Sequence, residues 1–554
     1  MRVRGLVLLA LAAGVLLALA PAAHAARPNV VIVLTDDQRW DTLSAMPTVQ
    51  SELVAKGVTF SNSFTVNPLC CPSRASFLTG LYSHSTRVYH NRGPRGLQSF
   101  NERSSIAIPL RAAGYRTGLI GKYMNDYITT RVPPGWHRWA VFTGSITHGR
   151  PPGFFDYDLA VDGTRESHGS AAADYSTDVL AAHAQDFIRD SPAGRPIFLL
   201  FAPFAPHHPA TPAPRHASAF PGLEPWRPPS YDEANVSDKP TWIRRRKRID
   251  GQEAARLDAL RGNQLRSLLA VDEAVGSILS TLEDEGRLAN TLILFTSDNG
   301  HYWGEHRLST KMAAYEESIR VPLVVRYDPL TTAPRTEGRF VANIDVAPTI
   351  ARFAGIRRTF HGQSFRPLLA RVPTAWRKTF LIENLRLNPG NVPTYCAVRG
   401  GRWTYVALRP EEEELYDLTT DPDQLRNRAR EPALRGQLLT MRARVRELCD
   451  PPPPTMNLDW ICTKIGSSAA ETMRGTAQSD GLCGSGGRDV LSGLGGNDLL
   501  RGGPGRDTLL AGAGKDRILA RDGDRDTIAC GAGGDWLLAD RLDVAAKDCE
   551  IVRR

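Results

Sequence analysis

The chain has 554 residues, of which 42% are hydrophobic and 23% are charged, and its formal net charge is +9. This length excludes a single small domain, because one hydrophobic core stops growing at roughly 250 to 300 residues. The positive charge favours an anionic substrate, yet no segment resembles a nucleic-acid-binding module, so we expect no nucleic acid partner.

The first 25 residues have the pattern of a secretory signal peptide. Arg2 and Arg4 precede an apolar run over 6–20, and Ala-His-Ala stands at 23–25. The run is shorter than the about 20 residues that span a membrane comfortably, and no later segment replaces it. We therefore expect a secreted protein with no integral membrane segment.

Four short apolar runs are each followed by polar residues, which is typical of buried parallel strands with functional carboxyl ends. The runs are 30–34, 118–120, 197–201 and 292–296. The polar residues after them are Asp36, Asp37, Lys122, His207, Asp298 and Asn299. Because an open α/β sheet binds ligands outside the carboxyl ends of its strands, we expect an α/β fold in which these residues converge.

A helix is predicted between the last two of these runs. Apolar residues recur at helical spacing over 265–282, and Gly286 stands where it would stop the helix. The basic run 244–248 precedes this helix and is the densest positive patch of the chain. Such a run is usually a solvated loop or helix face, and attraction of a sulfated glycan is the alternative.

The stretch that begins at Cys70 is the most informative motif. It reads Cys-Cys-Pro-Ser-Arg over 70–74, with Leu-Thr-Gly at 78–80. This pattern resembles the signature of the sulfatase family, and its register singles out Cys70 rather than Cys71. In that family a formylglycine-generating enzyme oxidises the cysteine to formylglycine, an aldehyde whose hydrate supplies a nucleophilic oxygen. A disulfide-forming pair would explain two neighbouring cysteines but not the pattern around them.

The resemblance to sulfatases covers roughly residues 28 to 430 and implies an alkaline-phosphatase-like fold. It also implies a Ca²⁺ ion in the active site. Its ligands would be Asp36, Asp37, Asp298, Asn299 and the modified Cys70. Oxygen ligands with several carboxylates suit Ca²⁺ better than zinc, which prefers histidine and cysteine.

The same resemblance assigns the catalytic side chains. Arg74 would hold the hydrated aldehyde in place, and Lys122 and Lys311 would bind the sulfate oxygens. His207 would protonate or bind the bridging oxygen of the ester, and His208 takes this role if the register slips by one residue.

One departure concerns the positions just after Lys122. Many sulfatases have a histidine there that helps to expel sulfate, whereas this chain has Met124 and Asn125, which leaves the elimination base open. Gly-Lys-Tyr-Met-Asn at 121–125 and Ala-Pro-His-His-Pro at 205–209 look most like the N-acetylglucosamine-6-sulfatase branch. This likeness implies a sulfated glycan substrate with 6-O-sulfated glucosamine.

Two other functions are compatible with these motifs. Related folds use the same signature to hydrolyse phosphonate monoesters or phosphodiesters, and a fold does not fix the substrate. The chain is alternatively a secreted glycan-binding protein whose hydrolase part is inactive, with an unmodified thiol at Cys70. Oligomeric state and exo or endo action are left open by the sequence.

The pattern changes after about residue 380. Short alternating segments such as 402–406 and 414–418 predict a small antiparallel subdomain over 381–450, after a catalytic domain over 26–380. Four prolines then open a predicted linker over 451–472.

A nine-residue repeat follows over 473–549. Its aspartates stand nine residues apart, at Asp480, Asp489, Asp498, Asp507 and Asp516. The repeat resembles hemolysin-type (RTX-like) calcium-binding nonapeptides, which implies a parallel β-roll with further Ca²⁺ near the last four of these residues. The apolar residue two positions after each of the four should face the interior. A glycine-rich disordered tail would not show this period.

The array is irregular at one turn. Asp526 comes ten residues after Asp516 instead of nine, and Asp535 restores the spacing.

Conversion of Cys70 would leave seven cysteines, so at least one should be free, and we expect it to be Cys71.

Overall fold

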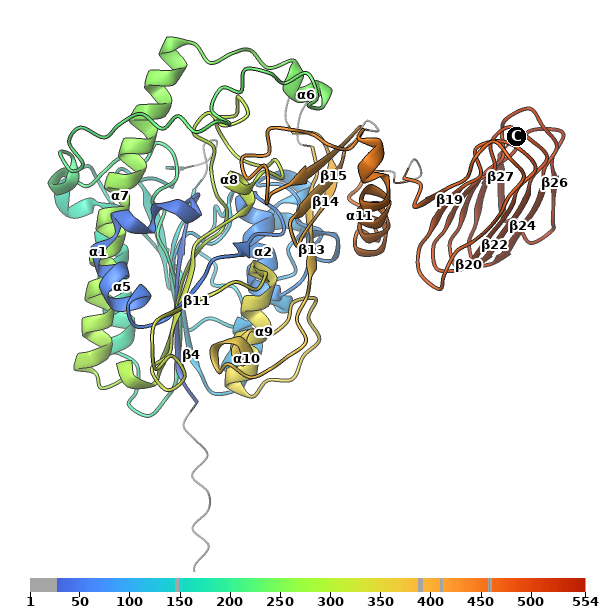
Figure 1. Ribbon diagram of the computed structural model, residues 1–554. Helices are drawn as coiled ribbons and strands as arrows, with labels where there is room; N and C mark the ends of the chain where they lie inside the picture. Colours follow the sequence, from blue (N-terminus) through green and yellow to red (C-terminus); the bar gives the residue numbers. More distant parts are fainter. Residues whose placement is uncertain are drawn as a thin grey trace, which may run out of the picture.

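In the computed structural model, the residues described are 27–144, 149–150, 152–386, 392–408, 412–456, 458 and 461–553 (Figure 1). The predicted signal peptide, residues 1–25, lies outside them. Every helix within these residues is too short or too polar to span a membrane.

A ten-stranded mixed sheet forms the centre of the molecule. In spatial order its strands are β11 (Arg335–Glu337), β2 (Val58–Phe60), β10 (Leu323–Arg326), β9 (Thr291–Ser297), β1 (Asn29–Thr35), β8 (Ile197–Ala202), β4 (Arg116–Gly121), β5 (Arg138–Phe142), β6 (Asp158–Val161) and β7 (Thr164–Ser167). The four predicted strands are β9, β1, β8 and β4, and they lie side by side in parallel. Their carboxyl ends therefore meet at one edge, and the predicted α/β fold is confirmed.

Helices cover both faces of this sheet (Figure 1). Side chains of β1 alternate between two cores: Val31 and Val33 face one, and Val30 and Ile32 face the other. The first core is covered by α1 (Pro47–Val49), α5 (Ser176–Arg189) and α7 (Gly251–Asp284). The second is covered by α2 (Cys70–Thr79), α4 (Ala107–Ala112), α9 (Val346–Ala354) and α10 (Arg366–Leu369).

Helix α7 is longer than the predicted helix over 265–282. Its N-cap residue is Asp250, whose side chain accepts a hydrogen bond of 2.9 Å from the Glu253 backbone amide. The helix ends before Gly286, which has a φ of 63° as expected for a stop residue. The remaining short elements are α3 (Ser83–Thr86), α6 (Thr241–Arg244), α8 (Glu316–Ile319), β3 (Ser63–Phe64) and β12 (Val341–Ala342).

A four-stranded antiparallel sheet follows, as predicted. Its strands are β13 (Thr379–Asn384), β14 (Tyr395–Gly400), β15 (Trp403–Leu408) and β16 (Glu412–Asp417). Helix α11 (Arg435–Leu448) packs on this sheet through Leu438, Met441 and Val445. A disulfide between Cys396 and Cys449 joins β14 to the end of α11.

The C-terminal part is a roll of two parallel sheets (Figure 1). One sheet contains β17 (Lys464–Ile465), β19 (Gly481–Cys483), β21 (Leu499–Arg501), β23 (Arg517–Leu519), β25 (Trp536–Leu538) and β27 (Ile551–Arg553). The other contains β18 (Thr472–Arg474), β20 (Val490–Gly495), β22 (Thr508–Ala513), β24 (Thr527–Ala532) and β26 (Val544–Ala545). Leu491, Leu500, Leu509 and Ile518 are buried between the sheets, as the repeat predicts.

The paired strands begin earlier than residue 473. Strand β17 lies inside the range predicted as linker and pairs with β19, and a disulfide between Cys462 and Cys483 ties the same two segments together. A third disulfide joins Cys530 to Cys549. Among the described cysteines, Cys70 and Cys71 are free and buried, as expected for Cys71.

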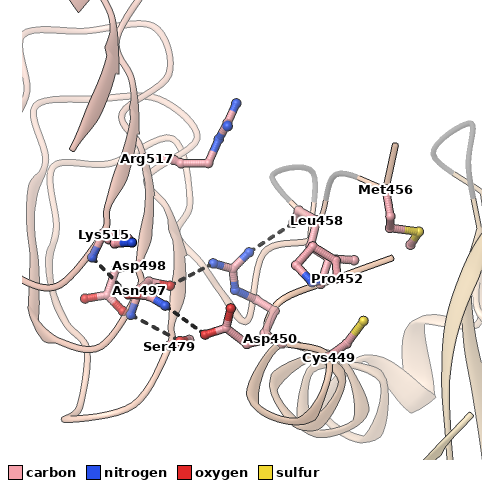
Figure 2. Close-up of a pocket in the computed structure, with 11 residues that line it drawn as sticks. Cys449, Asp450, Pro452, Met456, Leu458, Ser479, Asn497, Asp498, Lys515 and Arg517 are labelled. Atoms are coloured by element: carbon pink, nitrogen blue, oxygen red, sulfur yellow. Dashed lines mark hydrogen bonds between the residues drawn. The ribbon is translucent and has the colours of Figure 1, made fainter. Parts of the chain in front are cut away.

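One turn of the roll contacts the end of α11 (Figure 2). The Asn497 side-chain amide donates a 2.7 Å hydrogen bond to the Asp450 carboxylate, and the Arg446 guanidinium donates to the Asn497 carbonyl at 3.3 Å. Arg446 also donates to the Leu458 carbonyl at 3.0 Å. A pocket of about 300 Å³ lies at this contact, which joins the roll to the antiparallel subdomain.

Candidate active site

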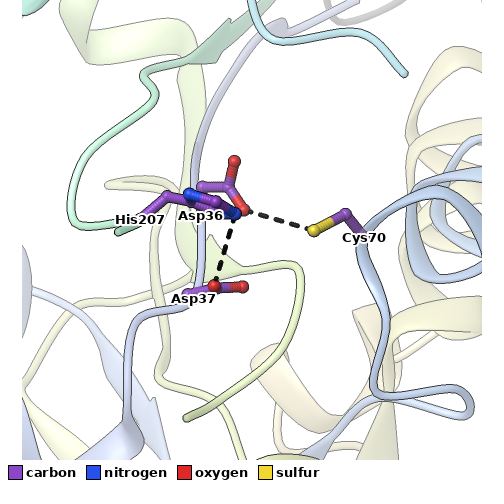
Figure 3. A group of neighbouring side chains, drawn as sticks. All are labelled: Asp36, Asp37, Cys70 and His207. Carbon is purple, nitrogen blue, oxygen red and sulfur yellow. Dashed lines mark hydrogen bonds and ion pairs between the residues drawn. The ribbon is translucent and has the colours of Figure 1, made fainter. Parts of the chain in front are cut away.

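Side chains from three separate segments converge at the carboxyl edge of the central sheet (Figure 3). Asp36 and Asp37 follow β1, Cys70 is the first residue of α2, and His207 lies in the loop after β8. One side-chain oxygen, sulfur or nitrogen from each of the four lies within 4.8 Å of the others. The sequence predicted all four for this site, and the structure brings them together.

The loop after β1 is held by two neighbouring loops. The Asp36 backbone amide donates to the Ala205 carbonyl at 3.2 Å, and that of Asp37 donates to the Asp298 carboxylate at 3.1 Å. Asp37 has a φ of 65°, a left-handed conformation that aspartate tolerates better than most residues. These contacts fix both carboxylates relative to the strand ends.

Cys70 lies at the start of α2, a helix whose ten residues are all buried. Its Sγ is 3.6 Å from an Asp36 carboxylate oxygen and 3.0 Å from the Lys311 Nζ. Burial raises the pKa of the Cys70 thiol to about 11. The sulfur is therefore protonated at neutral pH, which makes it a poor nucleophile in its encoded form.

Two lysines balance the charge of the two aspartates. Lys122 Nζ donates to Asp36, and Lys311 Nζ donates to Asp37. Burial alone would lower the pKa of Lys122 and raise that of Asp36, but their mutual attraction reverses both shifts. The Lys311 side chain is 10% exposed and that of Lys122 is 2% exposed, so Lys311 is the more accessible cation.

Arg74 is buried beneath these groups. Its Nε donates to the Asp298 carboxylate at 2.8 Å and its Nη1 donates to the Lys122 carbonyl at 2.6 Å. Its Nη2 is buried without a hydrogen-bond partner in the described part of the chain and lies 3.8 Å from an Asp36 oxygen. Burial and then Asp36 raise the pKa of Asp298 to about 6.

The oxygen atoms at this edge fit a hard cation. The Asn299 side-chain amide donates to Asp37 at 2.6 Å, and its Oδ1 is buried without a partner among the described residues. A buried oxygen without a donor is unusual, and a cation bound there would be the missing partner. Together with the carboxylates of Asp36, Asp37 and Asp298, this oxygen forms the kind of ligand set that Ca²⁺ accepts.

His207 and His208 have different environments. The Nε2 of His207 lies 3.7 Å from an Asp37 oxygen, and its ring packs on Phe204. Its Nδ1 donates to the His208 carbonyl at 2.6 Å, because a carbonyl can only accept. His208 is exposed, so the geometry favours His207 as the residue that faces the site.

The structure adds residues that the sequence did not single out. His301 is 4% exposed, and its Nδ1 has no hydrogen-bond partner in the described residues. Burial lowers the pKa of His301 to about 4, and Asp37, Lys311 and His207 are its charged neighbours. In the sequence, only its position directly after Asp-Asn-Gly at 298–300 could have indicated that His301 belongs to the site.

Met124 and Asn125, which occupy the positions where many sulfatases have a histidine, also have defined surroundings. Met124 is buried in the core on the α2 side of the sheet. Asn125 donates its backbone N–H to the Cys71 Sγ at 3.0 Å, and the Sγ lies 3.5 Å from the Asn125 Oδ1. Cys71 therefore holds Asn125 beside the start of α2.

The aspartates of the roll form two stacks. The Oδ1 atoms of Asp489, Asp498, Asp507 and Asp516 each accept a backbone N–H from a residue 18 positions earlier, at 2.7 to 2.8 Å. Their Oδ2 atoms are buried without partners among the described residues. A Cβ at Gly484, Gly493 or Gly502 would come within 2.3 Å of such an oxygen, so glycine is required there. This cradle of unpartnered carboxylate oxygens fits Ca²⁺.

Three family models match the chain. The sulfatase model matches residues 28–356, and the model of the C-terminal part of N-sulphoglucosamine sulphohydrolase matches residues 304–450. The RTX calcium-binding nonapeptide repeat matches four overlapping stretches between residues 465 and 537.

Known proteins of similar sequence cover the same part of the chain. N-acetylglucosamine-6-sulfatase from Homo sapiens is 33% identical over 472 residues, which covers 75% of this chain and 84% of that protein. The extracellular sulfatase SULF-1 homolog from Drosophila melanogaster is 34% identical over 375 residues, which covers 65% of this chain. The match spans only 33% of the Drosophila protein and 54% of a putative Caenorhabditis elegans homolog.

A solved structure, described as a complex with its substrate D-glucosamine-2-N,6-O-disulfate, has the same fold. It superposes with a TM-score of 0.69 at 24% identity, and the match covers 78% of this chain and 100% of that one. At this identity the likeness concerns the fold.

Proposed function

The chain belongs to the sulfatase family, and from this premise we propose that it is a secreted hydrolase of sulfate monoesters. The observation that carries the proposal is the convergence of Asp36, Asp37, Cys70 and His207 within 4.8 Å at the carboxyl edge of the sheet. Secretion is supported by the signal-peptide pattern over 1–25 and by relatives named as extracellular sulfatases.

Residue 70 is proposed to act as formylglycine, made from Cys70 by a formylglycine-generating enzyme. The Sγ stands where an oxygen of the hydrated aldehyde would lie, beside Asp36 and Lys311. The modification supplies an oxygen nucleophile for attack on sulfur. The high pKa of the encoded thiol supports this assignment, because it argues against a thiolate nucleophile.

A Ca²⁺ ion is proposed to be held by oxygens of Asp36, Asp37, Asp298, Asn299 and modified residue 70. Bound there, it supplies a Lewis acid for a sulfate oxygen. Lys122 and Lys311 stand against the same carboxylates and direct N–H donors into the site. They would bind the remaining sulfate oxygens by charge-assisted hydrogen bonds.

Arg74 is proposed as a positioning residue. It bonds the Asp298 carboxylate and the Lys122 carbonyl at once, so it fixes a metal ligand relative to a sulfate-binding lysine. Its unpartnered Nη2 lies within 3.8 Å of Asp36 and is directed at the same group of oxygens. The planar guanidinium suits this fixed arrangement better than lysine would.

His207 is proposed to give a proton to the bridging oxygen as the alcohol leaves. Its Nδ1 is committed to the His208 carbonyl, so Nε2 is the nitrogen that takes up and releases the proton. The His207 side chain is 26% exposed, more than any other member of the four-residue group described above. A departing alcohol therefore has a route to solvent beside it.

The proposed substrate is a glycan with 6-O-sulfated N-acetylglucosamine. The support is the likeness to N-acetylglucosamine-6-sulfatases and the motifs at 121–125 and 205–209. The net charge of +9 favours long-range attraction of such polyanions.

In the roll, Asp489, Asp498, Asp507 and Asp516 are proposed to bind further Ca²⁺.

Mass spectrometry of the peptide that contains residue 70 tests the proposal most directly. We expect an aldehyde there in active protein, and loss of more than about a thousandfold in turnover for Cys70→Ala with an unchanged circular dichroism spectrum. Cys71→Ser is the matched control and should keep the modification. Full activity with an intact thiol at residue 70 would refute the proposal.

Substrate comparison separates the alternatives. Rates on aryl sulfate, aryl phosphonate monoester and aryl phosphodiester should favour the sulfate, and 6-O-sulfated N-acetylglucosamine should be preferred over its 3-O-sulfated isomer. A faster reaction with the phosphonate or the phosphodiester would reassign the activity. An unmodified thiol without turnover of any of them would favour the inactive glycan-binding protein.

A further inference from the structure

A cavity of about 440 Å³ lies between the part built on the central sheet and the antiparallel subdomain. The first part contributes Trp40 after β1, Trp226 in the loop after β8 and Glu317 of α8 to its wall. The second contributes Arg399 of β14 and Asp423 after β16. The volume falls in the range of roughly 300 to 1,000 Å³ that small-molecule sites occupy, and such sites often lie between domains. None of the side chains assigned to catalysis above is among the described residues that line this cavity.

Two residues of the wall carry buried polar atoms without partners. The Trp40 Nε1 and the Glu317 Oε2 make no hydrogen bond within the described part of the chain. One is an N–H donor and the other is a carboxyl oxygen, and burial of either group without a partner is costly. A ligand in the cavity that both donates and accepts hydrogen bonds would be the missing partner.

Two arginines of the wall are already paired with carboxylates. Arg39 donates to Asp41 at 2.8 Å and to Glu305 at 2.6 Å. Arg399 donates to Glu316 at 2.8 Å. These guanidinium groups would have to give up their partners to bind an anion, which makes them poor anion-binding groups.

Carboxyl groups outnumber arginines on the wall. The carboxyl side chains are those of Asp41, Glu305, Glu316, Glu317 and Asp423, and the arginines are Arg39, Arg320 and Arg399. Glu317 and Asp423 form no ion pair within the described residues. A sulfated or carboxylated ligand would therefore meet negative charge that no cation balances.

A cationic ligand also fits this wall poorly. Burial, and then Glu305, raises the pKa of Glu317 to about 8, so this carboxyl is mostly protonated and uncharged at neutral pH. The Trp40 Nε1 can only donate, and an ammonium group has no atom that accepts. Uncharged hydroxyl groups suit both residues, because a hydroxyl donates and accepts.

Both tryptophans of the wall are held in place by their neighbours. The Arg320 guanidinium lies 4.0 Å from the centre of the Trp40 ring, and its Nε donates to the Ser61 carbonyl at 3.1 Å. The Trp226 Nε1 donates to Glu305 at 2.8 Å. Side chains that are fixed before a ligand arrives lose little conformational freedom when it binds. The C–H groups of a sugar ring can pack against such aromatic side chains while its hydroxyls form hydrogen bonds.

We propose that this cavity is a binding pocket for one uncharged sugar ring, either a free monosaccharide or an unsulfated residue of a glycan. The Trp40 Nε1 would donate to a sugar oxygen, and the Glu317 carboxyl would bond a sugar hydroxyl. The pocket is separate from the catalytic group, and sugar binding there does not require the hydrolysis proposed above.

Titration of the full-length protein with N-acetylglucosamine tests this pocket. With isotopically labelled tryptophan, we expect one indole N–H signal to shift as sugar is added. Trp40→Phe keeps an aromatic ring but removes the N–H, so it should lack that signal. Calorimetry should show binding that is about three- to tenfold weaker in Trp40→Phe and in Glu317→Leu, as expected for the loss of one hydrogen bond.

Two control variants make the same changes outside the cavity. Trp376→Phe removes an indole N–H that donates to the Phe340 carbonyl at 2.7 Å, and Glu283→Leu removes an exposed carboxyl from α7. Both should bind the sugar as the wild type does. Because the Glu317 carboxyl has no protein partner to lose, Glu317→Leu should retain the circular dichroism spectrum of the wild type.

The disaccharide of N-acetylglucosamine distinguishes the two sources of the ring. Equal affinity for both sugars would support a pocket for a free monosaccharide, and tighter binding of the disaccharide would support a residue within a chain. Unchanged affinity in Trp40→Phe and Glu317→Leu would overturn the proposal, since the sugar would then bind elsewhere, for example at the catalytic edge. Absence of an indole shift up to about 20 mM sugar would also overturn it. Binding of protonated glucosamine that is at least about tenfold tighter would replace the uncharged ligand by an ammonium ligand.

Discussion

At the level of single residues, His207 and His208 show how the fold distinguishes neighbours that look alike in the sequence. His207 is held between the Phe204 ring and Asp37, and its Nδ1 is anchored by the carbonyl of His208. The exposed side chain of His208 has no such arrangement. A leaving-group proton should therefore come from His207 alone.

Replacement of His207 by alanine should slow hydrolysis according to the leaving group. For an alkyl or sugar sulfate we expect a loss of roughly 10²–10⁴-fold in kcat, because the alcohol must be protonated as it leaves. For 4-nitrophenyl sulfate the loss should be much smaller, since nitrophenolate leaves without a proton. Steady-state rates on both substrates check this, with His208→Ala as the neighbouring control. A uniform loss on both substrates would contradict the role.

The residues of the site differed in how well the sequence could predict them. Cys70 and Arg74 belong to one contiguous motif, and the Asp-Asn-Gly at 298–300 follows a recognisable strand. His301 was not predicted, because a lone histidine is usually structural and its proximity to Asp37 arises only when β1 and β9 pair. The anchoring of Asn125 by Cys71 likewise joins residues 54 positions apart.

At the level of elements, long apolar runs were predicted well and weakly apolar ones were not. β1, β8 and β9 are buried along their whole length and consist largely of Val, Ile, Leu and Phe, whereas β4 has only Leu119 and Ile120 of these types. The first half of α7 is rich in polar residues, and the helical period becomes visible only near Leu265. Strand β17 has two residues, too few for any periodicity, and depends on pairing with β19.

The buried aspartates of the roll predict a pH dependence of its stability. Burial raises the pKa of Asp498 and Asp526 to about 7 and that of Asp516 to about 6, whereas an unfolded aspartate titrates near pH 4. Between about pH 4 and 7 the folded state binds more protons than the unfolded state. The free energy of unfolding therefore falls as pH rises through this window.

Calorimetry of the calcium-free, full-length protein should show this effect. We expect the transition of the roll to occur at a lower temperature at about pH 7.5 than at about pH 5, because the carboxylates ionise without a counter-charge. Saturating Ca²⁺ should raise the transition most at the higher pH, where the ligands are ionised. A calcium-free roll that is more stable at the higher pH would contradict the environment described for these aspartates.

At the level of the whole molecule, a small set of polar contacts joins the roll to the sulfatase part. The link between Asp450 and Asn497 connects the end of α11 to a single turn of the roll (Figure 2). Asn497 also accepts the Lys515 N–H at 2.9 Å, so the same side chain belongs to the roll's own stack. Asn497 therefore links the stack of the roll to the end of α11, which the Cys396–Cys449 disulfide ties to β14.

Loss of this link should loosen the end of α11 without changing catalysis. In Asp450→Ala we expect amide hydrogen exchange over 445–450 to rise roughly fivefold, which corresponds to about 1 kcal/mol for one hydrogen bond. Asn497→Ala should give the same change, and kcat/KM on an aryl sulfate should be retained. Arg506→Ala, at the matching turn position on the other edge of the roll, is the control. Unchanged exchange over 445–450 would show that the link has no effect on α11.

The burial of Cys70 bears on when the proposed formylglycine could be made. The residue has no exposed surface, and the whole of α2 around it is enclosed. The oxidation of residue 70 proposed above would therefore have to take place before this helix is buried in the fold. Molecules that fold before this modification would keep the thiol and stay inactive. The active fraction of a preparation would then depend on whether modification or folding came first.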